Sequence, residues 1–242
     1  MEKDPLLRGF KPLSNPRIIL GSFPTWTLTT PDKSKGETSY QKRRQREQNG
    51  DFPFFYGSAR NLFWEWFQKY VDSTLDPKDI VSIKAALEQH DIGITNLIRA
   101  AVRKGRSSFD YDLSQRTYNY MFFKKPENNI KILCTSKTVL NEMLLKKGFF
   151  DIYQRLGLHY NTAEISTQQS LLYSIGANTV LRQPIYRCLK TKQGHSIECL
   201  AIPSPGSPFR GLAYFGQKKG QPTKEFLEAY LRMAFNWFIS GS

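Results

Sequence analysis

The sequence predicts an α/β fold in which a largely parallel sheet is covered by helices on both faces. Short apolar runs, typical of buried strands, alternate along the chain with segments whose apolar residues recur at helical spacing. Such alternation favours parallel strands that are joined by helices. The length of 242 residues suits one domain of this class, and we expect a single domain over residues 1–242.

Four apolar runs are predicted to form the strands of this sheet. Each contains at least two Ile or Leu residues, as expected of strands that are buried on both faces. The runs are Arg17–Gly21, Asp91–Asn96, Ile130–Thr135 and Ile197–Ile202.

Helices are predicted from apolar spacing and from residues that favour helix starts. Ser58, Asp76 and Ser136 are common N-cap residue types, and Pro77 suits the first helical position. The predicted helices are Ser58–Tyr70, one that begins at Asp76-Pro77, one that follows Ser136, and a final helix that is capped near Thr223 and carries Phe226, Tyr230, Met233 and Trp237.

Residues 27–51 are predicted to be a basic insertion, because they show no clear period and carry the charge run Lys42–Arg46. Arg43 and Arg44 would contact phosphates if this insertion lies over a nucleic-acid backbone. The alternative is a solvated loop.

Three other segments are expected to lie outside the regular core. Met1–Pro16 is expected to be a surface arm, and Leu97–Asp112 a loop with several basic side chains and one acid, Asp110. Residues 149–196 are expected to be a variable segment, in which Gln168–Ile175 fits either a helix or a strand.

Composition indicates the class of partner. The chain has 35 Lys and Arg against 21 Asp and Glu, a net charge of +14, which favours a polyanion as partner over a generic basic protein. The sequence has no apolar run long enough to span a membrane and no signal peptide, so we expect a cytoplasmic protein, associated with the nucleoid if bacterial. Three separated cysteines without a Cys-x-x-Cys motif argue against a metal site or disulfides.

The segment Ala201–Arg210, with the sequence AIPSPGSPFR, follows a predicted strand. Proline restricts the backbone and glycine permits unusual angles, so this loop is expected to have a defined shape. The hydroxyl groups of Ser204 and Ser207, together with the N–H groups of Ser204, Gly206 and Ser207, would face an anion at the carboxyl end of the strand. An ordinary proline-rich turn is the alternative.

Three segments of the chain together resemble motifs of the uracil-DNA glycosylase superfamily. They are Leu20–Pro24 (LGSFP), Phe55–Trp64 (FYGSARNLFW) and Pro203–Arg210 (PSPGSPFR), in the order that the family has. The second segment is most similar to the hypoxanthine-releasing and mismatch-specific branches. The resemblance implies a three-layer α/β/α fold with a four-stranded parallel sheet, and a DNA glycosylase that removes hypoxanthine, uracil or xanthine without metal or cofactor.

The resemblance also implies roles for individual residues. Asn61 would be the catalytic residue, and Arg60 and Asp110 would act behind it; a helix-capping Asn and an Asx turn at Asp110 are the alternatives. The base pocket would be lined by Ser22, Phe23, Phe55, Tyr56 and Ile202. Phosphate would be held by Ser204, Gly206, Ser207 and Arg210. The partner is DNA, double- or single-stranded, and we expect a monomer.

Two departures from the family pattern keep other functions open. Ser22 and Phe23 stand where common members have Asp or Asn, and Ile202 stands where they have His. A non-catalytic nucleic-acid-binding protein on the same fold is therefore the alternative. A hydrolase of free nucleosides is a weaker one, because it would not need the excess of basic residues.

Overall fold

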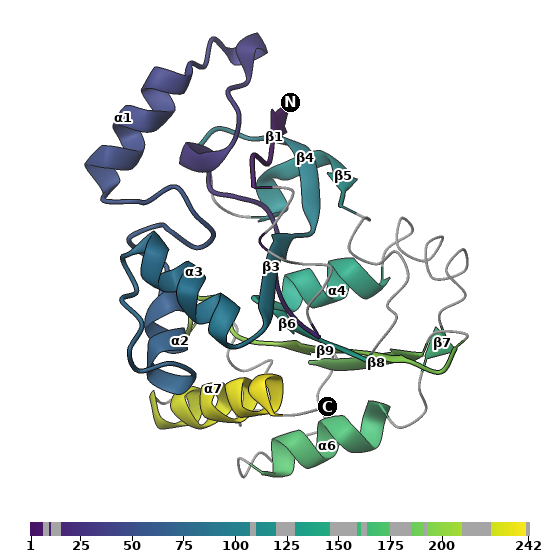
Figure 1. The fold of residues 1–242 in the computed structure, drawn as a ribbon. Coiled ribbons are helices and arrows are strands. Elements are labelled where there is room, and N and C mark those ends of the chain that lie inside the picture. The colour runs from purple at the N-terminus through teal and green to yellow at the C-terminus, as the bar shows by residue number, and fades with distance from the viewer. Residues whose placement is uncertain are drawn as a thin grey trace.

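A computed structural model describes residues 1–6, 10, 16–106, 110–119, 129–145, 159–160, 164–174, 185–190, 193–209 and 224–240. Within them the largest unit is a six-stranded sheet with the order β3-β2-β6-β9-β8-β7 (Figure 1). The strands are β2 (Arg17–Gly21), β3 (Ile92–Asn96), β6 (Ile130–Cys134), β7 (His159–Tyr160), β8 (Tyr186–Lys190) and β9 (Ser196–Ala201).

The α/β class is confirmed, but the expected four-stranded parallel sheet is wrong as a description of the whole sheet. The four predicted strands are β2, β3, β6 and β9, and they are adjacent and parallel. Strand β8 then pairs antiparallel with β9, and β7 pairs antiparallel with β8. The sequence did not indicate β8, because Arg187 and Lys190 interrupt its apolar residues.

A second, antiparallel sheet has the order β1-β4-β5. Its strands are β1 (Glu2–Lys3), β4 (Ile98–Arg103) and β5 (Leu113–Tyr118). This sheet corrects two expectations. The start of the chain is not a surface arm, since Glu2 and Asp4 are buried. Most of Leu97–Asp112 is not a loop, because β4 follows β3 after one residue and pairs on both sides.

Helices lie on both faces of the large sheet. Helix α4 (Lys137–Leu145) packs on β6 and β9 from one face, whereas α7 (Lys224–Ile239) and α6 (Glu164–Tyr173) cover the other face (Figure 1). Helix α2 (Phe63–Tyr70) packs on α7, and α3 (Ile80–Gln89) packs on β3. The core between these layers is rich in aromatic rings, among them Phe63, Trp64, Phe67, Tyr230 and Phe235.

Two predicted helix starts are wrong. Helix α2 begins at Phe63 and not at Ser58, since Ser58–Leu62 is used by turns. Helix α3 begins at Ile80, where the carboxylate of Asp79 accepts the N–H groups of Val81 and Ser82 and acts as the N-cap in place of Asp76.

Two other local expectations can be compared with the structure. The start predicted at Ser136 is confirmed, because its hydroxyl accepts the Val139 N–H at 3.1 Å. The segment that fitted a helix or a strand is helical through Tyr173. A start for α7 near Thr223 lies outside the described residues.

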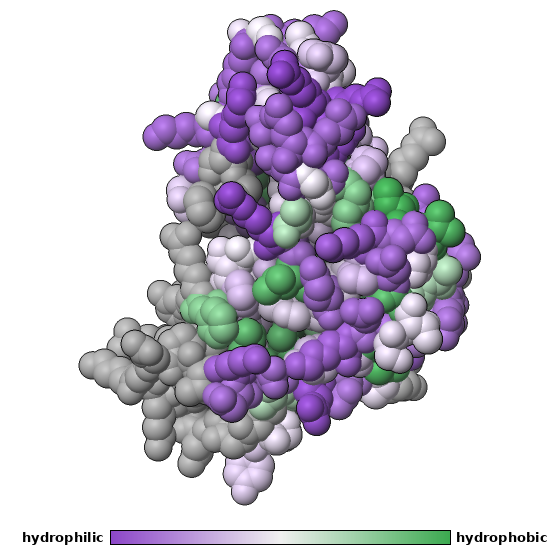
Figure 2. All heavy atoms as spheres, turned by 90° about the vertical axis from the view of Figure 1, so that its left-hand side faces the viewer, coloured by the Kyte–Doolittle hydropathy of each residue, from purple (hydrophilic) through white to green (hydrophobic). Residues whose placement is uncertain are grey.

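The basic insertion is ordered and mostly helical. It forms the short 3-10 turns η1 (Trp26–Leu28) and η2 (Lys33–Lys35) and the helix α1 (Ser39–Asn49). Thr38 and Gln41 form a capping box at the start of α1, and Gly50 ends it with a φ of 71°. Helix α1 projects from the rest of the molecule, and the face that carries it is predominantly hydrophilic (Figures 1 and 2). In the part of the chain that is described, no helix is both long and apolar enough to cross a membrane.

Candidate functional site

The site is built at the carboxyl ends of the parallel strands, where loops from distant parts of the sequence meet. The Leu62 N–H, just before α2, donates to the Pro205 carbonyl in the loop after β9 at 3.2 Å. The Tyr56 hydroxyl donates to Thr135 Oγ1, directly after β6, at 3.3 Å. These bonds bring the segment Phe55–Trp64 against the ends of β6 and β9.

Gly21, the last residue of β2, ties the first motif to the same place. A Cβ atom at Gly21 would stand 2.3 Å from Asn96 Oδ1 and 2.6 Å from the Tyr56 hydroxyl oxygen. Only glycine leaves room for two polar groups this close to the strand. The three motif segments therefore converge on one edge of the sheet.

Tyr56 is held in an unusual conformation at this edge. Its φ is +53°, a left-handed value that is rare for an aromatic residue and that marks functional or strained positions. Its ring packs on Phe63 with centroids 4.6 Å apart, and burial raises the pKa of its hydroxyl well above the usual value. Because Thr135 donates its own proton to the Leu20 carbonyl, Tyr56 is the donor toward Thr135, and its oxygen keeps lone pairs that accept.

Asn61 lies at the start of α2. Its Oδ1 accepts the Phe63 N–H at 3.0 Å, so the side chain caps the helix and its amide nitrogen is the group left to donate elsewhere. The side chain is half-buried, and the backbone N–H of the next residue, Leu62, is the one that donates to the Pro205 carbonyl. Asn61 therefore caps α2 directly before the residue that contacts the third motif.

The loop after β9 forms a compact turn. The Ser207 N–H donates to the Ser204 carbonyl at 3.0 Å, and the Ser207 hydroxyl donates to the Gly206 carbonyl at 2.8 Å. The Ser207 N–H is therefore committed inside the loop, which corrects the expectation that three N–H groups face an anion. Gly206 is exposed, with open space where a Cβ would stand. Arg210 lies outside the described residues.

The expected pocket residues do not lie together at the surface. Phe55 and Ile202 are 4% and 0% exposed, and both belong to the main core. The Ser22 carbonyl accepts the Ile98 N–H, and the Phe23 ring packs on the second sheet with the Arg103 guanidinium 5.3 Å away. Of the five, Tyr56 is the residue that the described contacts connect to the polar edge of the sheet.

A cluster of buried polar side chains at this edge was missed by sequence reasoning. We call Asp4, Thr95, Asn96, Asn119 and Thr135 the polar cluster; each is at most 6% exposed. Asn119 donates to the Thr95 hydroxyl and the Asn96 carbonyl, both at 3.2 Å. Buried polar groups are costly unless they are paired, so a cluster of them at the carboxyl ends of parallel strands indicates a functional site.

Asp4 is the ionisable member of the polar cluster. Its Oδ2 accepts the Asn96 side-chain N–H at 3.0 Å, its Oδ1 accepts the Leu6 N–H at 2.7 Å, and its own N–H donates to the Arg99 carbonyl. Burial raises the pKa of Asp4 to about 6, against the lowering effect of the two hydrogen bonds. The position of Asn96 at the end of a predicted strand is a sequence signal that could have marked it as a site residue. No pattern around Asp4 indicated that its side chain is buried.

The remaining predicted residues surround this edge in different ways. Burial is the main cause of the raised pKa of Tyr56, and the charge of Asp110, in the 3-10 turn η3 (Asp110–Asp112), adds to it. Arg60 is exposed, and no contact in the described part of the chain joins it to Asp110. Arg43 is exposed and paired with Glu47 at 2.8 Å, and Arg44 is also exposed.

A buried charge network fixes the basic insertion to the second sheet. Lys42 is 3% exposed, and its ammonium donates to the Trp26 carbonyl and the Thr29 hydroxyl, both at 2.9 Å, and lies 3.2 Å from Glu37. Thr29 in turn donates to Glu2, which pairs with Arg103 at 3.0 Å. Lys42 is thus an anchor of α1 and not part of its exposed basic surface.

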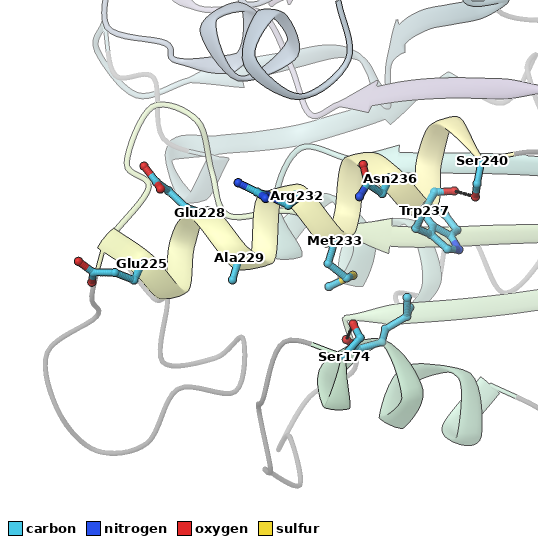
Figure 3. Close-up of a pocket in the computed structure, with 10 residues that line it drawn as sticks. Ser174, Glu225, Glu228, Ala229, Arg232, Met233, Asn236, Trp237 and Ser240 are labelled. Atoms are coloured by element: carbon cyan, nitrogen blue, oxygen red, sulfur yellow. Dashed lines mark hydrogen bonds between the residues drawn. The ribbon is translucent and has the colours of Figure 1, made fainter.

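A separate groove of about 760 Å³ lies between α6 and α7, on the helical layer (Figure 3). Met233 points from α7 toward α6, the Trp237 ring packs edge-on against Tyr186 of β8, and Glu225, Glu228 and Arg232 give the groove mixed charge. It contains none of the predicted site residues, and it is lined by helices instead of by the strand ends.

Within the described ranges, no group of three or more His, Cys, Asp or Glu side chains is placed to hold a metal ion. Comparison of the chain with protein-family models, with curated proteins and with solved structures gives no match.

Proposed function

We propose that this protein is a DNA glycosylase that hydrolyses the N-glycosidic bond of a deaminated base, namely hypoxanthine, uracil or xanthine. The observation that supports this best is the convergence of three distant motif segments on one edge of the parallel sheet. Ligands of open α/β sheets bind at this edge. We further propose that the protein acts in the cytoplasm, on the nucleoid if bacterial.

The proposed reaction requires the target nucleotide to leave the stack before its bond is cut. The bond between sugar C1′ and the base nitrogen breaks, and the base leaves with the electron pair. Water supplies the oxygen that bonds to C1′, and the proton that this water releases neutralises the departing base. In this proposal, Asn61 acts where negative charge develops, because the amide nitrogen is free of the capping bond and the N-terminus of α2 favours anions.

The proposal assigns recognition of the base to the Tyr56 edge of the site. Tyr56 and Asn96 offer hydrogen-bonding groups beside Gly21, and the Tyr56 ring is an aromatic surface of the kind on which bases stack. Affinity for DNA would come from the excess of basic residues, with the exposed arginines of α1 contacting phosphates outside the site.

The test is incubation of excess enzyme with duplex and single-stranded oligonucleotides that carry one uracil, hypoxanthine or xanthine, followed by alkaline cleavage of abasic sites. Strand breaks at the modified base are expected. No breaks on any substrate would end the catalytic proposal.

Variants of Asn61 separate catalysis from helix capping. Asn61→Ala removes both the amide and the cap, whereas Asn61→Ser keeps an oxygen that accepts the Phe63 N–H. Both variants are expected to lose at least about tenfold in excision rate, a lower bound compared with the roughly 10²–10⁴-fold that a positioned catalytic group typically contributes, with DNA affinity nearly unchanged. Full activity of Asn61→Ser would assign Asn61 to capping alone.

A non-catalytic nucleic-acid-binding protein on the same fold is the second proposal. It is favoured by the absence of Asp, Asn or His at positions 22, 23 and 202, and by the burial of Ile202. It predicts salt-sensitive binding to DNA without turnover. A binding constant that does not change with salt would reject both proposals.

A further inference from the structure

The hydrogen bonds of Asp4 define the orientation of the Asn96 carboxamide. Both carboxylate oxygens of Asp4 accept an N–H: Oδ1 accepts from Leu6 at 2.7 Å, and Oδ2 accepts from Asn96 Nδ2 at 3.0 Å. Because Nδ2 of Asn96 is turned toward Asp4, its Oδ1 is turned toward Gly21. The site therefore presents a carbonyl oxygen, an acceptor, next to the Tyr56 oxygen.

Protonation of Asp4 weakens this arrangement. It adds an O–H donor to the carboxyl group, and neither observed partner can accept that proton, because the Leu6 N–H and the Asn96 Nδ2 are both donors and the backbone N–H of Leu6 has no freedom to turn away. The Asn96 carboxamide can rotate by half a turn, so that its Oδ1 accepts from protonated Asp4. Its Nδ2, a donor, then faces Gly21 and Tyr56.

We propose that Asp4 is a positioning residue whose charge state selects whether Asn96 offers an acceptor or a donor at the site. Ionised Asp4 favours a ligand with an N–H donor, and protonated Asp4 disfavours it. This inference rests on the proposed function: deamination converts a ring nitrogen that accepts into one that carries a hydrogen, in hypoxanthine and in uracil alike. The ionised state is then the state that accepts a deaminated base.

The burial of Asp4 and Asn96 supports this coupling between the charge of Asp4 and the orientation of the Asn96 carboxamide, which we call the switch. Asp4 and Asn96 are 5% and 4% exposed, so water does not substitute for either partner, and the pKa of Asp4 is raised to about 6, inside the range in which enzymes are assayed. The other titratable groups whose charges act at this edge are Tyr56 before α2, Cys134 on β6 and Asp110 on η3. The test must distinguish Asp4 from these.

Asp4→Asn provides that distinction. The Leu6 N–H requires the oxygen of the new amide, so its NH₂ faces Asn96 and holds Asn96 in the orientation of protonated Asp4. For wild type, kcat/KM on hypoxanthine-containing DNA is expected to fall at least tenfold between pH 7.5 and pH 5, with a midpoint near 6. Asp4→Asn should show the low value at every pH. The control Asp76→Asn, an exposed acid before α3, should keep the wild-type profile.

An NMR titration of wild type decides the inference even if no base is excised. The side-chain amide resonances of Asn96 should move with a midpoint near 6, and in Asp4→Asn they should stay near their low-pH positions. Resonances that do not move between pH 5 and pH 7.5 in wild type would overturn the inference, as would an unchanged activity profile in Asp4→Asn. Loss of cleavage on all substrates, with the titration intact, would refute the glycosylase and leave the switch standing.

Discussion

Gly21→Ala is the most direct perturbation of the site, because it places one methyl group at the point where the motif segments converge. The new Cβ would stand 2.3 Å from Asn96 Oδ1 and 2.6 Å from the Tyr56 oxygen, whereas real Cβ atoms almost never approach another atom within 3.0 Å. Asn96 and Tyr56 must both retreat, and Tyr56 then loses its bond to Thr135.

The expected loss of stability follows from these contacts. Overpacking of a well-filled site costs about 1–3 kcal/mol, and loss of a hydrogen bond costs about 1 kcal/mol more. A total of about 2–4 kcal/mol corresponds to a fall in Tm of roughly 10 °C for a chain of this length. Thermal and urea unfolding, followed by circular dichroism, measure both quantities.

Gly206→Ala is the matched control. Gly206 lies in the loop after β9, where a Cβ meets nothing within 4 Å, and its φ is outside the left-handed range. The Tm of Gly206→Ala should stay within about 2 °C of the wild-type Tm, since substitutions at exposed positions rarely change stability by more than about 0.5 kcal/mol. Equal Tm values for the two variants would refute the convergence of Tyr56 and Asn96 on Gly21. Partial recovery in the double variant Gly21→Ala with Tyr56→Phe would confirm the contact.

Three further predictions concern charge. Lys42→Met should lower the free energy of unfolding, measured in urea, by about 3 kcal/mol, because it leaves Glu37 and the Thr29 hydroxyl without their buried cation. The exposed control Arg43→Ala should leave the urea midpoint unchanged, and equal midpoints for the two variants would contradict the anchoring role of Lys42. Burial raises the pKa of Asp4 in the folded state to about 6, above its ordinary value of 3.8, so the folded state binds the proton more tightly and stability should fall by about 3 kcal/mol in total as pH rises from below 3.8 to above 6. Asp4→Asn should lack this decline, and an identical decline in the variant would assign it to another group. If about five phosphates are contacted, DNA affinity should fall by about 10²–10³-fold for a fourfold rise in salt concentration, measured by fluorescence anisotropy. The double variant Arg43→Ala with Arg44→Ala should lower the slope of log affinity against log salt concentration, and an unchanged slope would place the DNA away from α1.

Local pattern was sufficient where a short segment decides its own structure. Strands β2, β6 and β9 were predictable because short runs rich in Ile and Leu are typical of strands that are buried on both faces of a sheet. The cap at Ser136 was predictable because a hydroxyl needs only the next few N–H groups. The start of α2 was not, since Asn61 accepts the Phe63 N–H and the turns before it displace the expected cap at Ser58.

The amino-acid sequence by itself determined the α/β class, the order of the four parallel strands along the chain and the basic character of the protein. Tertiary structure alone decided which charged groups are buried. Asp4 meets Asn96 because β1 pairs with β4, almost a hundred residues away. Lys42 is buried because it faces η1, whereas its neighbour Arg43 is exposed to solvent. The burial of a side chain depends on long-range packing, which no local sequence pattern contains. The pKa of a buried acid and the contacts of a buried cation therefore depend on this packing as well.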